Sequence, residues 1–554
     1  MAKQESAVPP WKGQIRVRGA TAPSGSQWVR VRKAEQSVWL PRFDFMLDHR
    51  ALKHRLAAAG LYLSRAEFVE LEKHVASMSK FPPRNLIEHP GWTNGCFGLP
   101  DGRLFAPDGS TAVRLFAPDP GRCDSSGTVE EWLSVVEQLQ GQQLAVFLLM
   151  AAFVAPLLEL THRSGNFGFE LCGRAGNGKT TLLQLMASVA GRAVMGPGPV
   201  YFSSCNTTVN ALEQRAQAHR DLPLLLDDAT LFAAAQSGSP RASQLKHFVF
   251  SLAQGETKAR YNGARHQFRT TFVVTTNVPL SDVIAELAAA EVGATGDRLL
   301  SLDLDLTDNG NFDFVPNSFP NSGAFARHMI EGIAAHYGTA MPRYLEQLVS
   351  LRAEDERDLR GKIMRRADEF ITMVVADRSD GSAVRVAEAF GLVRVAGRLA
   401  QHFGVLPSCF DCDEAAVTAY RLHLATVERM SPIQRLEAYV GSPGVRDLDA
   451  EKTRWLTMEE ISTTPGFWKT NREGDREFIV WPEVFKRAFP DWRRVIRDRA
   501  VLSLMPGDGR HRGKKRHLRR HHPDDRYFCF RLPRCADEVR NRTTPAARKN
   551  HVRK

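Results

Sequence analysis

Gly173-Arg-Ala-Gly-Asn-Gly178-Lys179-Thr180 stands between an apolar segment, Phe167 to Cys172, and a run with helical periodicity, Thr181 to Val189. The octapeptide fits Gly-x-x-x-x-Gly-Lys-Ser/Thr, a loop whose backbone N–H groups and following helix cradle phosphates. Lys179 can reach the terminal phosphates, and the Thr180 hydroxyl can join the shell of a Mg²⁺ ion. We therefore predict an ATP site. Its expected nucleotide-binding residues are Gly173, Gly176, Asn177, Gly178, Lys179, Thr180 and Thr181.

Length and charge indicate a multidomain protein with a polyanionic partner. The 554 residues are too many for one core, and 43% of them are hydrophobic, which is enough to fill several cores. The net charge is +12, and the basic excess lies in residues 491–554. Such a block is expected to attract the phosphates of DNA, although a solvated basic tail would have the same composition.

The cysteines and the apolar runs indicate a cytoplasmic protein. Eight cysteines are scattered along the chain and do not form a disulfide framework. Cys409-Phe-Asp-Cys412 could supply half of a zinc site, but no second pair stands at zinc-ribbon spacing, so two reduced thiols are the simpler interpretation. The longest uncharged apolar run, Leu144 to Leu158, is too short to span a bilayer. We predict a buried helix there, and no signal peptide or membrane span.

Periodicity and composition divide the chain into segments of different structure. Strand and helix patterns alternate around the phosphate loop, as in a parallel sheet that is covered on both faces, so the fold class is α/β. Two helices and a basic hairpin near the C-terminus suggest a winged helix. The predicted segments are a partly disordered basic N-terminus (1–40), a small α+β domain (41–126), the α/β phosphate-loop core (127–321), a helical lid or linker domain (322–445), a winged-helix-like DNA-binding domain (446–533) and a disordered basic tail (534–554).

Polar residues also mark the ends of further apolar segments. Leu222-Pro-Leu-Leu-Leu ends in Asp227 and Asp228, at the edge where ligands bind an α/β sheet. Asp227 would hold Mg²⁺, and Asp228 would polarise the attacking water. Asn277, after the segment Thr271–Thr275, could orient that water, although Asn at a strand end is also an ordinary turn former. Arg298 could stabilise the transition state in a neighbouring subunit, or form a surface ion pair.

The order and spacing of these parts resemble those of AAA+ ATPases. From Gly91 to Gly338 the chain is similar to a domain-of-unknown-function family found in helicase-like proteins of phages, plasmids and mobile elements, classed as helicases and inactivated derivatives. The segments that carry the resemblance are 151–160, 178–183, 187–191, 222–228, 298–300, 334–338 and 477–485. That family is similar to the hexameric minichromosome-maintenance helicases. The resemblance implies an ATP-driven homo-hexameric ring that translocates on DNA, and leaves room for a primase or loader as a partner.

Two basic regions are the predicted contacts with DNA. Gly255 to Arg269 lies where the helicases of the resemblance carry a hairpin that projects into the pore of the ring. Asn262-Gly263 predicts a tight turn there, and the hairpin would meet single-stranded or forked DNA, unless it is merely a solvated basic hairpin. The second region would contact duplex phosphates. The predicted DNA-binding residues are Lys258, Arg260 and Arg265 in the hairpin, and Arg493, Arg494, Arg497, Arg512, Lys514, Lys515 and Arg516 in the C-terminal domain.

Asp228 departs from the family pattern, which usually has Glu at this position. Loss of one methylene withdraws the carboxylate by about 1.5 Å, which would weaken water activation. The leading hypothesis is an ATP-dependent DNA helicase or translocase of a mobile element or phage. Two alternatives remain: a nucleotide-binding assembly protein on DNA that does not hydrolyse ATP, and a small-molecule kinase, which would have no use for Asn277, Arg298 or the basic C-terminus.

Overall fold

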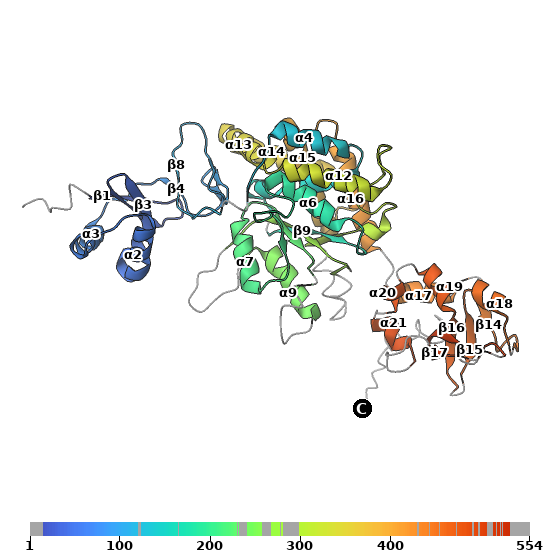
Figure 1. Cartoon of the computed structure of the whole chain (residues 1–554). Coiled ribbons are helices and arrows are strands. Elements are labelled where there is room, and N and C mark those ends of the chain that lie inside the picture. Colours follow the sequence, from blue (N-terminus) through green and yellow to red (C-terminus); the bar gives the residue numbers. More distant parts are fainter. Residues whose placement is uncertain are drawn as a thin grey trace, which may run out of the picture. The chain divides into compact units, whose positions relative to one another are not determined.

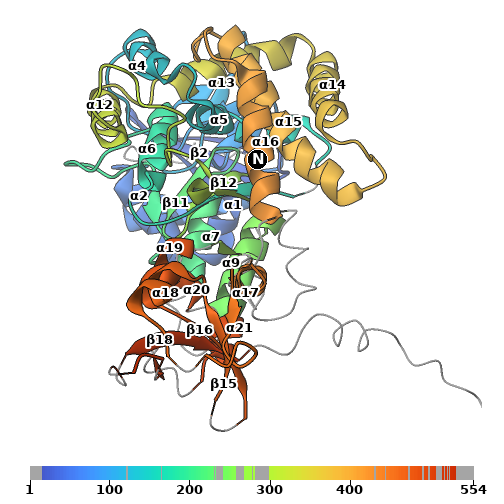
Figure 2. The same ribbon diagram turned by 90° about the vertical axis from the view of Figure 1, so that its right-hand side faces the viewer.

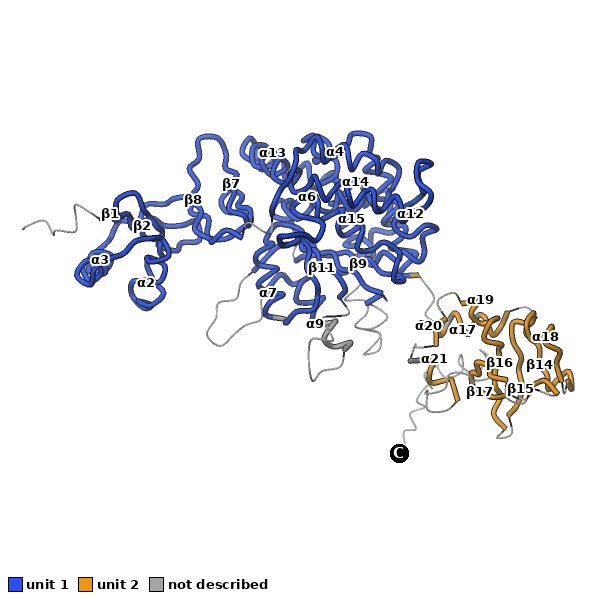
Figure 3. Tube along the Cα trace, viewed as in Figure 1, with its two compact units in different colours: residues 1–427 blue, residues 428–554 orange. Residues whose placement is uncertain are grey.

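A five-stranded parallel sheet lies at the centre of the first of two compact units, residues 1–427 (Figures 1 and 3). In this computed structural model the strands stand in the order β10-β11-β12-β9-β13, and every neighbouring pair is parallel. Their bounds are β9 (Phe167–Cys172), β10 (Ser203–Ser204), β11 (Leu224–Asp227), β12 (Thr271–Thr275) and β13 (Leu299–Asp303). The parallel sheet that the sequence predicts is therefore confirmed.

The structure describes most of the chain. The described residues are 15–119, 123–163, 165–229, 231, 241–256, 267–277, 279–280, 298–428, 432–442, 444–453, 455–471, 474–489, 492–496, 499–506, 514–516, 518–520, 522 and 525–531.

Helices cover both faces of the sheet, which explains why its strands are almost wholly apolar. All six residues of β9 are buried, and β11 begins directly after Pro223, which has no N–H to donate to a neighbouring strand. One face packs against α7 (Val209–Ala218) and α9 (Arg241–Gln254). The views in Figures 1 and 2 place the other helices of the core on the opposite face. They are α5 (Gln143–Ala151), α6 (Lys179–Ala190), α12 (Ser322–Ala335), α13 (Ala340–Glu354), α14 (Glu356–Val374), α15 (Gly381–His402) and α16 (Cys412–Val427).

The helices after residue 322 share a hydrophobic core with the sheet. Phe147 of α5, Phe169 of β9 and Phe390 of α15 pack with ring centroids 5.2 to 5.4 Å apart. The helical character of this region agrees with its periodicity. However, the boundary that we expected at residue 322 does not separate two cores, because apolar faces of α15 and α16 are buried against α5 and β13.

The N-terminal segment is more ordered than its composition suggests. Residues 15–41 form an antiparallel sheet of three strands, β1 (Ile15–Thr21), β2 (Gln27–Lys33) and β3 (Gln36–Pro41). The expectation of partial disorder over residues 1–40 is therefore wrong for residues 15–40. Apolar residues alternate with arginine in β1 and β2, so one face enters a core while the charged face meets solvent. The alternation, and not the content of basic residues, decides the structure of this segment.

Short helices and strands follow, as the sequence predicts for residues 41–126. They are α1 (Arg42–Leu47), α2 (His49–Ala58), α3 (Arg65–Ser77), β4 (Asn85–Ile87), β5 (Gly91–Thr93), β6 (Cys96–Gly98), β7 (Leu104–Phe105) and β8 (Ala112–Arg114). Asn94 and Gly95 both adopt positive φ in the turn between β5 and β6, a backbone that the pair Asn-Gly favours. Before the phosphate loop come α4 (Val129–Val136), α5 and the 3₁₀ helix η3 (Ala155–Leu160). The apolar run 144–158 is thus a buried helical segment, as predicted.

The second unit, residues 428–554, has a mixed sheet in the order β14-β15-β16-β18-β17. It begins with α17, whose Leu436 is buried in the core of this unit, rather than at the expected residue 446. Pro482 opens helix α19 at the position where its missing N–H costs nothing, and β17 pairs with β18 in antiparallel fashion. The elements are α17 (Pro432–Val440), β14 (Arg446–Asp447), α18 (Met458–Thr463), β15 (Phe467–Thr470), β16 (Arg476–Val480), α19 (Pro482–Ala488), α20 (Trp492–Val495), α21 (Arg499–Leu504), β17 (Lys514–Lys515) and β18 (Arg526–Phe530). A five-stranded sheet is larger than the hairpin we expected, and a winged helix stays a prediction.

In the part of the chain that the structure describes, no helix combines the length and the apolar character needed to cross a bilayer.

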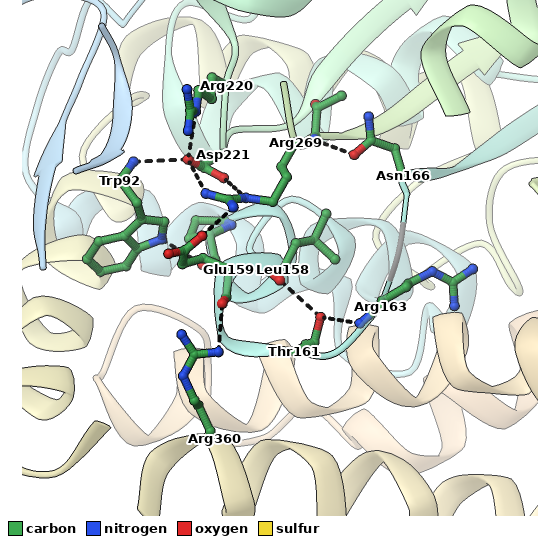
Figure 4. Close-up of polar contacts among 12 residues, drawn as sticks. Trp92, Leu158, Glu159, Thr161, Arg163, Asn166, Arg220, Asp221, Arg269 and Arg360 are labelled. Atoms are coloured by element: carbon green, nitrogen blue, oxygen red, sulfur yellow. Dashed lines mark hydrogen bonds and ion pairs between the residues drawn. The ribbon is translucent and has the colours of Figure 1, made fainter. Parts of the chain in front are cut away.

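A buried carboxylate holds together four segments at the edge of the sheet where β11 and β12 begin (Figure 4). Asp221 is fully buried and accepts hydrogen bonds from the backbone N–H of Trp92 and from Nε of Arg269, both at 2.9 Å. Arg269 also pairs with Glu159 of η3, and Arg360 of α14 donates to the backbone oxygen of Glu159 at 2.9 Å. This network fastens β5 and η3 to the residues that precede β11 and β12.

His89 beside this network should make stability depend on pH. Nη1 of Arg220 lies 2.9 Å from Nε2 of His89, so that nitrogen must be unprotonated to accept the bond. Burial and then the charge of Arg220 lower the pKa of His89. In the unfolded chain its pKa is about 6.5, so the stabilisation is complete above that pH and falls as the pH drops toward the lower pKa of the folded state.

We therefore expect the thermal unfolding midpoint to fall by a few degrees more in the wild type than in His89→Gln between pH 7.5 and 5.5, because the glutamine oxygen accepts from Arg220 without titrating. The exposed His54→Gln serves as the control and should behave like the wild type. Equal pH dependence in the wild type and His89→Gln would contradict this account.

Candidate functional site

The phosphate loop has the backbone that its glycines allow. Gly173, Gly176 and Gly178 have φ of 139°, 91° and 80°, a region that favours glycine. A Cβ on Gly178 would stand 2.2 Å from Cγ of Asn311, so only glycine fits there. Helix α6 begins directly after Gly178, at Lys179. The predicted strand, loop and helix are all present, and the helix N-terminus faces the loop, as an anion site requires.

A pocket of about 420 Å³ brings the loop together with the ends of β11 and β12. Its polar residues come from three segments far apart in the sequence, and the parallel pairing of β9, β11 and β12 gathers them at one edge. The pocket is lined by Ala175, Gly176, Gly178, Lys179, Thr180, Thr181, Asp227, Asp228, Thr275, Thr276 and Asn277. Gly173 and Asn177 stand in the loop but do not line the pocket.

Lys179 is held within the loop by main-chain oxygens. Its side chain is mostly buried, and Nζ donates to the carbonyl oxygens of Gly173 and Arg174, both at 2.8 Å. Burial lowers the pKa of Lys179, and the nearby carboxylate of Asp305 opposes that shift. Phosphate oxygens are charged acceptors and would attract this ammonium more strongly than carbonyl oxygens do. The position of Lys179 therefore suits it to bind the terminal phosphates of a nucleotide.

Thr275 ties the acidic end of β11 to β12. Its Oγ1 donates to Oδ1 of Asp227 at 2.6 Å and accepts from the backbone N–H of Asp228 at 2.8 Å. Asp228 has φ of 54°, which a non-glycine residue adopts rarely and which is often found at functional sites. The Thr275 hydroxyl thus holds both residues of the acidic pair, and sequence analysis did not single it out.

The oxygen donors of the pocket suit Mg²⁺. Thr180 and Asp227, the two predicted metal ligands, both line the pocket. Mg²⁺ prefers oxygen ligands and usually takes only one or two from protein, with substrate phosphates and water completing its shell. Among the described residues no group of three or more His, Cys, Asp and Glu side chains could hold a metal by itself. A hydroxyl and a carboxylate beside a phosphate loop therefore fit a metal that arrives with a nucleotide.

Asn277 lies in the pocket and Arg298 does not. Strand β12 stands between β11 and β9, so Asn277 at its end lines the pocket together with the acidic pair and the loop. Arg298 precedes β13, and its backbone oxygen accepts from Gly168 N at 2.9 Å. Arg298 therefore lies at the edge of the parallel sheet where the strands begin. The carboxyl ends of the strands, where the pocket lies, are roughly 15 Å away. Its guanidinium carbon lies 5.1 Å from the ring centroid of Phe250.

Asp305 fastens the phosphate loop from outside the pocket and was missed by sequence analysis. Its Oδ1 accepts from N and Nε of Arg174, at 3.0 and 3.2 Å, and from Nδ2 of Asn177 at 2.5 Å. Asn177, predicted to bind nucleotide, instead directs its side chain to this carboxylate. The signal in the sequence is the pair Asp303 and Asp305, which stand at the end of β13 and two residues beyond it. It resembles the acidic end of β11, but an acidic pair alone does not reveal its partner.

Cys409 and Cys412 are not in a disulfide, and two reduced thiols stay the simpler prediction. Cys412 is buried beside Gln401, with Sγ 3.2 Å from Oε1. Burial raises the pKa of Cys412 to about 12 and also raises the pKa of Cys409. Burial therefore keeps both thiols protonated at neutral pH.

Few of the predicted DNA contacts can be placed. Lys258, Arg260, Arg265, Arg497 and Arg512 lie outside the described residues, as do the side chains of Arg493 and Arg494 in α20. At the ends of the predicted hairpin, Glu256 and Gln267 form an antiparallel bridge. Lys514 and Lys515 form β17, and Lys515 is exposed. Arg516 is engaged inside the unit, since its Nη2 lies 2.6 Å from the buried carboxylate of Glu477. This ion pair indicates a structural role for Arg516 within the second unit.

Comparison with known proteins supports a helicase-like fold. Residues 27–268 match the family model of a domain of unknown function, DUF927. A solved structure described as "SCCmec type IV Cch - active helicase" is similar over 94% of this chain and 93% of its own, with 14% identity and a TM-score of 0.54. The apo structure of the NrS-1 C-terminal region aligns with 71% of this chain and 88% of its own length at 10% identity. Its TM-score of 0.24 is too low to indicate a shared fold. No sequence among curated proteins matches.

The family match includes the phosphate loop and the acidic pair, and it ends before Asn277, Arg298 and the second unit. The chain therefore has a fold that resembles a helicase over nearly its whole length. The closer relation to AAA+ and minichromosome-maintenance helicases stays a prediction.

We expect Asp305→Ala to weaken ATP binding by about tenfold, because the loop loses charge-assisted hydrogen bonds to Arg174 and Asn177. Titration calorimetry with Mg·ATP measures this, and Asp308→Ala removes the same charge from an exposed neighbour as the control. Tighter binding by Asp305→Ala would show that charge repulsion between this carboxylate and the phosphates outweighs its support of the loop.

Proposed function

We propose that this chain is an ATP-dependent DNA helicase or translocase that serves the replication of a mobile element or phage and works as a homo-hexameric ring. The observation that carries the proposal is the pocket in which Lys179, the acidic pair and Asn277 meet. Each of these positions was predicted from a separate motif, and chance would not be expected to bring them to one edge of the sheet. The helicase-like fold over 94% of the chain supports the proposal.

The residues of the pocket divide the work of ATP hydrolysis. The backbone N–H groups of the loop and the ammonium of Lys179 hold the phosphates and neutralise their charge. Thr180 and Asp227 would hold Mg²⁺, which would supply positive charge beside the phosphates. Asp228 accepts a hydrogen bond from the attacking water and makes it a better nucleophile. Asn277 is uncharged, so it orients that water without competing for the metal.

A ring accounts for the position of Arg298. This residue directly precedes β13 at the edge of the sheet opposite its own pocket, which it cannot reach. In a ring, the same edge of one subunit can face the nucleotide of the next, and an arginine supplied in trans stabilises the charge of the transition state. A heterologous interface of this kind closes into a ring when the rotation between subunits allows it.

DNA is the proposed polyanionic partner. The antiparallel bridge between Glu256 and Gln267 supports a hairpin that presents Lys258, Arg260 and Arg265 to DNA in the pore. Lys514 and Lys515, in a short strand of the second unit, are proposed to contact duplex phosphates. A primase or loader is a further proposed partner, and the cytoplasm is the proposed compartment.

Asp228 supports a second candidate, a DNA-bound assembly protein that binds ATP without hydrolysing it. The side chain is one methylene shorter than the Glu of the resembling family, and its backbone is held in the left-handed region by Thr275. A displacement of about 1 Å at a reacting group can lower a rate by about a hundredfold. The two candidates therefore differ in hydrolysis and share nucleotide binding.

ATP turnover with and without single-stranded and forked DNA separates these functions. We expect turnover that DNA stimulates, and strand separation on the fork. Lys179→Ala should lower turnover on the order of a hundredfold, because a charge on the transferring phosphate loses its partner. Lys452→Ala removes an exposed lysine in the second unit and is the control.

Each alternative has its own outcome in this assay. No turnover in the wild type, together with turnover in Asp228→Glu, would favour the assembly protein. Phosphate transfer to an added metabolite without DNA stimulation would favour a kinase. Absence of ATP turnover with every DNA, in both the wild type and Asp228→Glu, would exclude the helicase.

A further inference from the structure

Glu170 is a fully buried carboxylate in the middle of strand β9, which lies between β12 and β13. Its neighbours in register are Val274 of β12 and Ser301 of β13. Val274 belongs to the apolar core beneath this face of the sheet, with Phe272 and Leu299. A carboxylate on such a face is costly unless hydrogen bonds compensate for its lost hydration. The groups that donate hydrogen bonds to Glu170 therefore indicate the role of this carboxylate.

Three donors from two neighbouring segments satisfy this carboxylate. Oε1 accepts from the hydroxyl of Thr276 at 2.6 Å and from the backbone N–H of Leu280 at 2.8 Å. Oε2 accepts from the hydroxyl of Ser301 at 2.6 Å. Hydroxyl-to-carboxylate bonds of this length are charge-assisted and strong. Oε1 of Glu170 therefore binds the segment after β12, and Oε2 binds β13.

The two residues bound by Oε1 stand on either side of Asn277 in the sequence. Thr276 lines the nucleotide pocket beside Asn277, and its own N–H donates to the backbone oxygen of Leu171 at 2.9 Å. Leu280 lies three residues beyond Asn277 and is fully buried. Asn277 itself is exposed at the pocket. Contacts with β9 on both sides thus restrict where an otherwise exposed side chain can lie.

We propose that Glu170 is a positioning residue for Asn277, which it holds at the distance from the phosphate loop that ATP hydrolysis requires. Glu170 and the loop belong to one continuous piece of chain, β9 and the residues after it, so this carboxylate fixes Asn277 relative to the phosphates. The inference rests on the proposed ATPase function and extends it to a buried residue that does not line the pocket.

Asn166 provides a structural comparison within the same strands. It is buried just before β9 and bonds to Thr270 N, just before β12, and to the backbone oxygens of Leu252 and Phe268. Asn166 and Glu170 each join the β9 segment to the β12 segment through two hydrogen bonds, and each makes a third to another element, α9 for Asn166 and β13 for Glu170. Asn166 lies at the edge away from the pocket. A substitution of Asn166 therefore removes buried hydrogen bonds between the same strands without disturbing the segment around Asn277, and serves as a control.

The experiment measures basal ATP turnover, Mg·ATP affinity and thermal unfolding in variants of the full chain. Glu170→Met keeps the length of the side chain but accepts no strong hydrogen bonds, whereas Glu170→Gln keeps an oxygen for Thr276 and Leu280 and can donate to the Ser301 hydroxyl. We expect Glu170→Met to lower kcat by about tenfold, with affinity within about threefold of the wild type. Glu170→Gln should restore most of the rate.

A double-mutant cycle with Asn277→Ala tests whether Glu170 acts through Asn277. If it does, Glu170→Met should slow Asn277→Ala by less than about twofold, because the residue to be positioned is already gone. Asn166→Leu should lower the unfolding temperature with kcat within about twofold of the wild type. Additive losses of rate from Glu170→Met and Asn277→Ala, or an equal loss of kcat in Asn166→Leu, would overturn the proposal.

Hydrogen exchange at the Leu280 amide provides a reading that does not depend on hydrolysis. In the nucleotide-free chain this amide should exchange faster in Glu170→Met than in the wild type or Glu170→Gln, while the amides of β9 keep their protection. Unchanged exchange in Glu170→Met would overturn the positioning role. If the wild-type chain hydrolyses no ATP at all, the proposed function fails, and exchange alone then decides whether Glu170 anchors this segment.

Discussion

Parallel pairing of β9, β11 and β12 is the constraint on which the proposed chemistry depends. Parallel strands present their carboxyl ends at the same edge, so the residues that follow each strand converge although they are far apart in the sequence. The loop follows β9, the acidic pair ends β11, and Asn277 follows β12. Apolar helices on both faces bury the sheet and keep that edge fixed.

The two edges of the sheet hold different groups of residues. The carboxyl edge holds the pocket, with Asp305 and Glu170 fixing the loop and the segment around Asn277. At the amino edge, Asp221 joins β5 to Arg269, the last residue of the segment where the DNA hairpin is predicted. Strands β11 and β12 connect the two edges. The proposed translocase would use this connection to transmit changes at the nucleotide to its DNA contacts.

Local patterns in the sequence predicted the parts of the site, and long-range contacts supplied what the patterns could not. Gly173 to Thr180 and the strand ends were visible because their chemistry depends on neighbours in the chain. Asp305 and Glu170 were not, because their partners lie more than a hundred residues away in the sequence. Residues 15–40 were expected to be partly disordered since their many arginines concealed an alternating pattern. The helices after 322 were predicted, but periodicity does not reveal that they share the core of the sheet.

The central claim is that one pocket binds a nucleotide together with Mg²⁺, and calorimetric titration of the full chain with ATP tests it most directly. The account predicts one site per chain, tighter binding with Mg²⁺ than with a chelator present, and loss of binding in Lys179→Ala. Binding that is equally strong in the wild type and Lys179→Ala, or no binding by the wild type, would contradict it.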